Sequence, residues 1–145
     1  GLAILYVVMH ENDSAGKYFR ETIRVKPSAE AYGNYANYLE MNGKIDSALL
    51  MFDKAVSLTK ENYVPYMNRG IVLKKQNRWD EATADLEKAI TINPDAGEIY
   101  YIRSEIDTQK HDYANALKNV EKAISLGYNK VDNYYYDLLK QRAGQ

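Results

Sequence analysis

The stretch YMNRGIVLKKQNRWDEATADLEKAITINP, residues 66–94, reads as two short amphipathic helices around a polar turn. In its first half, Tyr66, Gly70 and Leu73 lie at positions i, i+4 and i+7, which form one face of an α-helix. Pro94 ends the second half, because proline cannot continue a helix. Such a pair has only a small apolar face and is not expected to be stable alone, so the rest of the chain has to cover it.

Residues of similar type recur every 34 positions, over three consecutive units without a gap. Small residues in the first predicted helix face alanines in the second, which lets the two axes approach closely, and large residues fill the remaining space. Repeated pairs of this kind bury their open faces against one another and build a continuous core. The recurring sets are Tyr32, Tyr66, Tyr100 and Tyr134; Ala36, Gly70 and Ser104; Ile45, Trp79 and Tyr113; Ala48, Ala82 and Ala116; Phe52, Leu86 and Val120; Ala55, Ala89 and Ala123; Leu58, Ile92 and Leu126.

The composition and charge argue against several classes of function. The 145 residues carry a net charge of −1, so no basic field is present to gather nucleic acid. The chain has no cysteine, which excludes disulfides and zinc–thiolate sites and is compatible with a cytoplasmic or a bacterial periplasmic location. His10 and His111 lack partners at ligand spacing, and Asp80, Glu81 and Asp85 are interpreted as a solvated helix face. We therefore expect no catalytic residue, cofactor, metal site or nucleic-acid partner.

These repeats resemble the tetratricopeptide repeat family, whose pattern runs from an aromatic opening through small and large residues to a closing proline. The third unit departs from that pattern at Asp107, where a large apolar residue is usual, and we expect Asp107 to pair with Arg103 at i−4. The resemblance implies an all-α, right-handed α-solenoid of helix-turn-helix repeats in one domain, residues 1–145. Its parts would be a truncated repeat at 1–28, repeats at 29–62, 63–96 and 97–130, and a capping helix at 131–145.

The resemblance also implies a non-enzymatic protein-interaction module or scaffold, because such repeats commonly hold an extended peptide or a partner's helix along their first helices. First-helix side chains that point away from the core are therefore the candidate groove residues. Asn37 and Asn68 stand out, since an amide can bond both a backbone N–H and a C=O of a bound peptide. The full set is Glu30, Asn34, Asn37, Met41, Met67, Asn68, Ile71, Lys74, Lys75, Tyr101, Ile102, Glu105 and Gln109.

One subfamily of co-chaperones holds the C-terminal carboxylate of heat-shock chaperones with two asparagines and several basic residues. Asn37 and Asn68 fall at the two asparagine positions of that arrangement. Gly33, Glu98 and Ile102 fall where lysine or arginine is required. A carboxylate binds poorly without its cations, so we expect no complete carboxylate clamp.

The 14 tyrosines exceed what the repeat needs for its core. Tyrosine offers large contact area at little entropic cost, so the surplus is a candidate recognition surface. The repeat places Tyr32, Tyr66, Tyr100 and Tyr134 in the core and leaves Tyr63, Tyr101, Tyr135 and Tyr136 for that surface.

The segment LAILYVVM, residues 2–9, is apolar around nearly the whole circumference of a helix and too short to span a bilayer. We expect it to be covered by an upstream helix, a membrane surface or a second copy of the chain. It could also tuck into its own repeat, and the chain could be a regulatory or substrate-positioning domain of a larger, membrane-embedded enzyme. The second copy is the simplest cover, as a homodimer with contacts at Leu2, Ile4, Leu5, Val7 and Val8.

Overall fold

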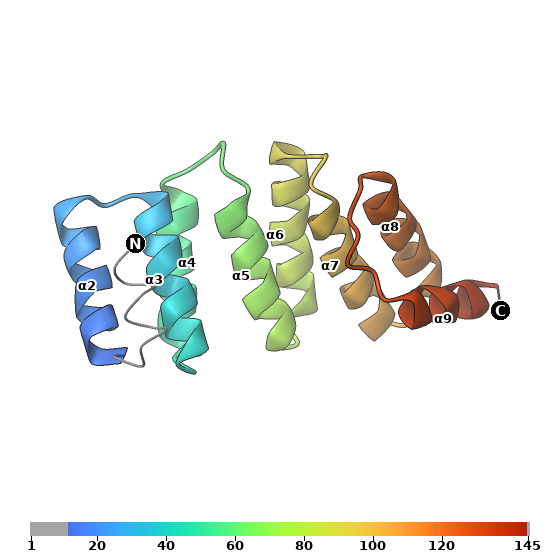
Figure 1. The fold of residues 1–145 in the computed structure, drawn as a ribbon, viewed down its shortest axis with the longest axis horizontal. Coiled ribbons are helices and arrows are strands. Elements are labelled where there is room, and N and C mark those ends of the chain that lie inside the picture. The colour runs from blue at the N-terminus through green and yellow to red at the C-terminus, as the bar shows by residue number, and fades with distance from the viewer. Residues whose placement is uncertain (1–11, 145) are drawn as a thin grey trace. The chain divides into compact units, whose positions relative to one another are not determined.

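The computed structural model describes residues 12–144, and every regular element in that range is an α-helix (Figure 1). This confirms the predicted all-α fold of paired helices. The contacts within the chain define two compact units, residues 1–72 and residues 73–145, with their boundary inside α5. The helices are α2 (Asn12–Val25), α3 (Ala29–Met41), α4 (Ile45–Ser57), α5 (Val64–Lys75), α6 (Trp79–Ile92), α7 (Gly97–Gln109), α8 (Tyr113–Ser125) and α9 (Asn133–Ala143).

The turns inside the helix pairs share one backbone conformation. Gly43, Asn77 and His111 have φ angles of 72°, 58° and 61°, in the left-handed region that commonly ends a helix. In each turn the following residue donates its backbone N–H to the carbonyl five residues earlier, at 2.9, 3.0 and 2.8 Å. The turns lie where the 34-residue period of the repeat predicts them. His111 takes the left-handed backbone conformation in one of them.

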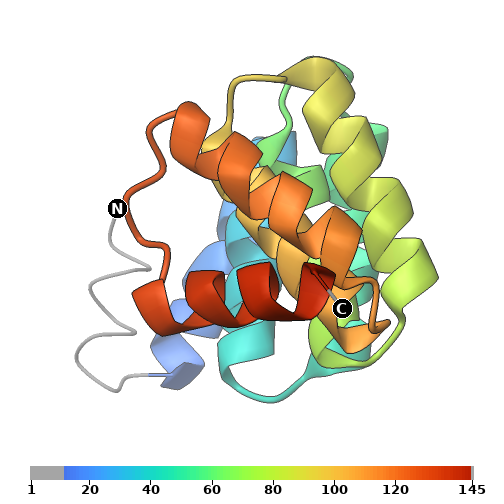
Figure 2. The ribbon, with the colours of Figure 1, turned by 90° about the vertical axis from the view of Figure 1, so that its right-hand side faces the viewer.

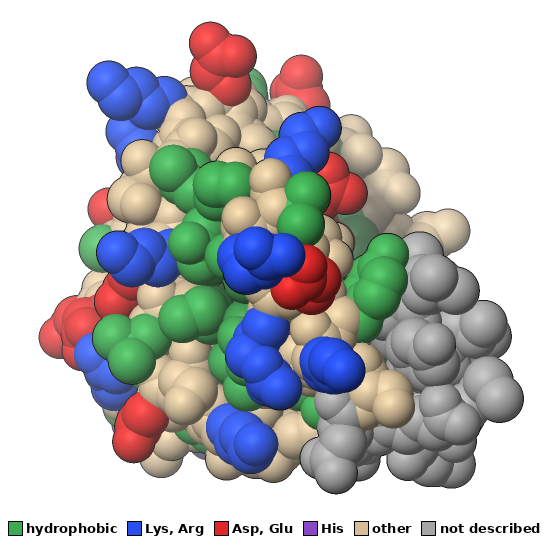
Figure 3. Space-filling view, turned by 90° about the vertical axis from the view of Figure 1, so that its left-hand side faces the viewer, with side chains coloured by type: hydrophobic (Ala, Val, Ile, Leu, Met, Phe, Trp, Pro, Cys, Tyr) green, Lys and Arg blue, Asp and Glu red, His purple; other side chains and the backbone are tan. Residues whose placement is uncertain are grey.

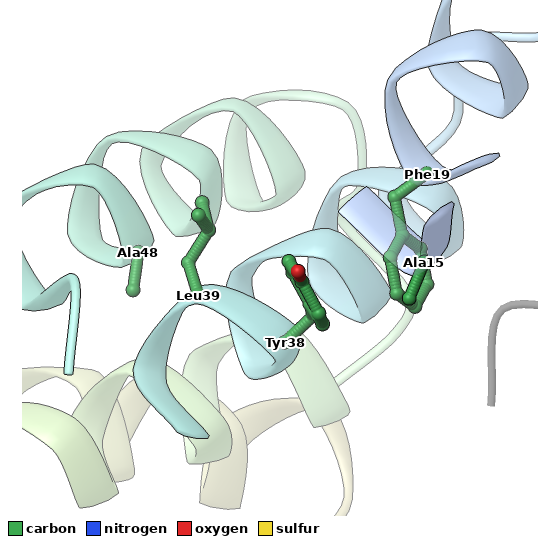
Figure 4. Packing of buried hydrophobic residues seen from close by; sticks show 5 residues of the cluster. All are labelled: Ala15, Phe19, Tyr38, Leu39 and Ala48. Carbon is green, nitrogen blue, oxygen red and sulfur yellow. The ribbon is translucent and has the colours of Figure 1, made fainter. Parts of the chain in front are cut away.

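One core cluster of the first unit lies between α2, α3 and α4. Phe19 of α2 packs on Tyr38 of α3 with ring centroids 5.3 Å apart, and Leu39 belongs to the same cluster (Figure 4). Ala15 and Ala48 are completely buried in it. Alanine at these two places lets the helices approach closely, as the small positions of the repeat predict.

The core of residues 73–145 is closed by α9, which lies against α8 (Figure 2). Val120 of α8 and Leu139 of α9 are completely buried in one cluster. The Tyr135 hydroxyl makes hydrogen bonds with the hydroxyls of Ser104 at 3.2 Å and Thr108 at 2.8 Å, both on α7. The last helix is therefore fixed to α8 by apolar packing and to α7 by polar contacts.

The prediction that Tyr134 belongs to the core is wrong, because this side chain is 77% exposed. The buried face of α9 is shifted by one residue and consists of Tyr135 and Leu139 at i and i+4. No second helix follows α9 within the described residues, so nothing there enforces the register of the repeat. The tyrosines expected on a recognition surface are all half-buried: Tyr63, Tyr101, Tyr135 and Tyr136.

The predicted pair of Arg103 and Asp107 is replaced by contacts to other helices. Arg103 Nη1 lies 3.2 Å from Glu87 Oε1, and Asp107 Oδ2 accepts a hydrogen bond from Asn119 Nδ2 at 2.7 Å. Burial raises the pKa of the Asp107 carboxyl, and the Asn119 bond and the Arg103 charge oppose this in part. The carboxylate at position 107 is therefore partly desolvated without full compensation.

We expect Asp107→Asn to raise the thermal unfolding midpoint at pH 7. The pKa of this carboxyl is higher in the folded protein than in the unfolded chain. Ionisation of Asp107 therefore lowers the free energy of unfolding as the pH rises through the folded-state pKa. The asparagine carries no charge and keeps an oxygen that can accept from Asn119. The gain should shrink as the pH falls toward 3.8, the ordinary value for aspartate. Melts from pH 7 down to pH 4 check this, and the exposed Asp95→Asn is the control. A gain that is independent of pH would contradict the explanation.

Candidate functional site

A surface pocket of about 300 Å³ opens between α3 and the start of α5, within residues 1–72. Four of its lining residues form a stripe along α3 at positions i, i+3, i+4 and i+7, the spacing of one helix face. The opposite wall comes from the end of the α4–α5 loop and the first turns of α5. The lining residues are Ala29, Glu30, Gly33, Asn34, Asn37, Asn62, Val64, Pro65 and Asn68.

The wall from α5 is held in place by hydrogen bonds local to the loop. The Thr59 hydroxyl accepts from the backbone N–H of Asn62 at 3.1 Å, and the Asn62 side chain accepts from that of Val64 at 3.0 Å. Pro65 follows in the first turn of α5, where a backbone N–H would have no partner within the helix. These contacts fix the direction in which α5 leaves the loop and so define the pocket wall.

The polar groups of the pocket are mostly amides that the described chain leaves unused. Asn34, Asn37 and Asn68 make no side-chain hydrogen bond to any part of the chain that the structure describes. Each amide offers two donors and one acceptor. Among the lining residues that the structure describes, Glu30 is the one ionisable side chain, and none is a lysine or an arginine. The pocket therefore suits a ligand with both donors and acceptors and disfavours a free carboxylate.

Gly33 lies in the interior of α3, where glycine costs about 1 kcal/mol relative to alanine. The atoms of Gly33 are themselves buried, yet a Cβ at this position would meet no heavy atom within 4 Å. Packing within the described chain thus gives no reason for a glycine here. Its effect is to leave position 33, between Glu30 and Asn34 on the α3 wall of the pocket, without a side chain.

The predicted groove residues are divided between this pocket and other environments. Glu30, Asn34, Asn37 and Asn68 line the pocket together. The others do not line it: Met41, Lys75 and Gln109 are exposed, Ile71 and Tyr101 are half-buried, Met67 and Ile102 are buried, and Lys74 forms an ion pair with Glu105.

The helical offsets used for prediction missed five lining residues. Gly33 lies on the stripe of α3 with Glu30, Asn34 and Asn37, so the offset pattern could have included it, and Ala29 adjoins the stripe at the first position of the helix. The remaining three depend on the loop conformation, which helical spacing does not predict: Asn62, Val64 and Pro65.

Three other expectations concern sites elsewhere in the chain. Within residues 12–144, no helix is both long and apolar enough to cross a membrane. The same range contains no cluster of three or more His, Asp or Glu side chains suited to a metal ion. The proposed dimer contacts, Leu2, Ile4, Leu5, Val7 and Val8, lie outside the described residues. Seen from the side of α2, the surface shows hydrophobic side chains interspersed with Lys and Arg (Figure 3). Tyr18 and Val25 of α2 are exposed large hydrophobic residues.

The chain belongs to the tetratricopeptide repeat family. Two sequence profiles described as Tetratricopeptide repeat match residues 1–63 and 63–96. Repeats of this family generally serve as protein-interaction modules and are typically non-catalytic, and no catalytic family matches the sequence. A comparison with curated proteins finds no match.

Several solved structures have a similar fold at low sequence identity. A crystal structure of MamA protein is 18% identical with a TM-score of 0.84, covering 98% of this chain and 79% of that one. PilF of Pseudomonas aeruginosa is 23% identical with a TM-score of 0.82, covering 99% and 74%. The first tetratricopeptide domain of Spaghetti (RPAP3), described as bound to the HSP90 peptide SRMEEVD, is 19% identical with a TM-score of 0.76, covering 81% and 94%. These likenesses concern the fold.

Proposed function

We propose that this chain binds an extended segment of a partner protein in the pocket between α3 and α5. The observation that carries the proposal is a set of three amides around one opening of about 300 Å³, Asn34, Asn37 and Asn68, whose side chains make no hydrogen bond within residues 12–144. An extended backbone presents N–H and C=O groups in alternation, and an asparagine amide can pair with both. Membership in a family of interaction modules supports the same class of function. A structure of similar fold is described as holding a peptide.

The test begins with ligands selected from a heptapeptide library displayed on phage, with affinities measured by calorimetry. Replacing Asn37 and Asn68 together by alanine should weaken binding by about tenfold, because each lost hydrogen bond is worth about 0.5–1.5 kcal/mol. The fold should be affected little, since changes at such positions usually shift stability by less than about 0.5 kcal/mol each.

A matched control replaces by alanine two exposed amide residues outside the pocket lining, Asn129 and Gln141. That double variant should bind the selected peptides with the affinity of the parent chain. If the Asn37→Ala, Asn68→Ala variant also keeps the parent affinity for every selected peptide, the pocket is not the binding site and the proposal fails.

A further inference from the structure

We propose that Gly33 determines which ligands the pocket binds. The ligand is an internal segment of a partner chain that carries a basic residue. Because Gly33 has no side chain, the main chain of that segment can approach α3 closely. This inference rests on the proposed function and adds the class of ligand. It excludes a C-terminal carboxylate as the group that the pocket recognises.

The packing of the described chain does not explain the glycine at position 33. Glycine in a helix interior is unfavourable, and it is commonly kept where another backbone approaches closely. Nothing in the described chain approaches Gly33, since a Cβ built there meets no atom within 4 Å. Gly33 nevertheless lines the pocket, between Glu30 and Asn34 on the same helix face. The close approach that would explain it is therefore that of a bound chain.

The charge of the pocket lining favours a basic ligand over an acidic one. A free carboxylate needs cationic donors, and the described residues of the lining provide none. Glu30, in the first turn of α3, is exposed and forms no ion pair with any residue that the structure describes. A lysine or arginine in the bound segment would complement this carboxylate. The neutral amides along the rest of the wall match an uncharged main chain, such as that in the middle of a polypeptide.

The experiment uses the selected heptapeptides, synthesised with acetylated N-termini and amidated C-termini, and the free-acid peptide SRMEEVD as an acidic probe. We expect the blocked peptides that carry Lys or Arg to bind as well as their free-acid forms, and SRMEEVD to bind at least about tenfold more weakly. Glu30→Gln should weaken the basic peptides by about two- to fivefold and reduce the dependence of their affinity on salt.

The decisive variant is Gly33→Ala. It should raise the thermal midpoint by about 2–4 °C, because alanine favours the helix and meets no steric obstacle. It should also weaken peptide binding by about tenfold or more, because a methyl group then occupies the place of the bound main chain. Gly144→Ala, at the end of α9 and outside the pocket lining, is the matched glycine control and should leave affinity unchanged. A more stable protein that binds less well is an outcome that loss of folding cannot produce.

The outcomes separate the inference from the proposed function. If Asn37→Ala with Asn68→Ala reduces binding but Gly33→Ala binds as the parent does, the inference is overturned and the proposed function stands. The inference also fails if the selected peptides require a free C-terminus or if SRMEEVD binds as tightly as the basic peptides. If neither the asparagine nor the glycine variants change affinity, both proposals fail together.

Discussion

Phe52→Ala is expected to lower the free energy of unfolding by about 3–5 kcal/mol. Phe52 of α4 is completely buried, and its cluster in residues 1–72 includes Ala36 of α3 and Val72 of α5. Removing the ring leaves a cavity among three helices whose backbones cannot collapse into it, so lost transfer energy and lost packing add together. Denaturation in guanidinium chloride, followed by far-ultraviolet circular dichroism, measures the loss.

The matched control lies on the same helix. Leu50 is 61% exposed, so Leu50→Ala removes a large apolar side chain without leaving a buried cavity and should cost less than about 1 kcal/mol. A similar loss for Phe52→Ala and Leu50→Ala would contradict the assignment of Phe52 to the core.

The helix pairs and their turns were predictable from the sequence because the residue types that recur every 34 positions are those that the packing requires. A completely buried alanine such as Ala48 tolerates no larger side chain without overpacking, so its type recurs wherever two helices meet closely. The turns recur for a different reason, since Gly43, Asn77 and His111 all take the left-handed conformation that closes a helix end. Both constraints are local to one helix pair, so spacing alone reveals them.

The details that spacing did not predict depend on contacts between helices. Asp107 was expected to pair within α7, but its carboxylate meets Asn119 of α8, and nothing in the repeat pattern specifies that contact. The pocket lining likewise contains residues that the sequence predicted and residues that it did not. Asn37 and Asn68 could be assigned from helical offsets, whereas Asn62 enters the lining through the hydrogen bonds of a loop. The helix pairs and their turns were predictable, whereas the contact of Asp107 with Asn119 and the conformation of the α4–α5 loop were not.

The second large effect is expected at Leu139, where replacement by alanine should cost about 2–5 kcal/mol. Leu139 is completely buried with Ala116 and Val120 of α8, and it is the fully buried side chain that α9 contributes to this cluster. The hydrogen bonds of Tyr135 to α7 cannot hold the helix alone, because a typical hydrogen bond contributes only about 0.5–1.5 kcal/mol. Hydrogen exchange of the α9 amides should therefore accelerate in the variant, together with a loss of global stability in denaturant.

Leu138→Ala is the control that distinguishes two registers of α9. The 34-residue repeat places Leu138 at the small-residue position held by Ala36, Gly70 and Ser104, whereas the structure buries Leu139 completely and Leu138 only in part. If the buried face of α9 is the one containing Tyr135 and Leu139, Leu139→Ala must be the more damaging change, and amide exchange in α9 must respond more strongly to it. Equal losses, or a larger loss for Leu138→Ala, would mean that α9 follows the register of the repeat after all, with Tyr134 turned toward the core. Because the two residues are adjacent and chemically identical, their helix propensity and their distance from the chain end hardly differ, and the comparison reports on burial alone.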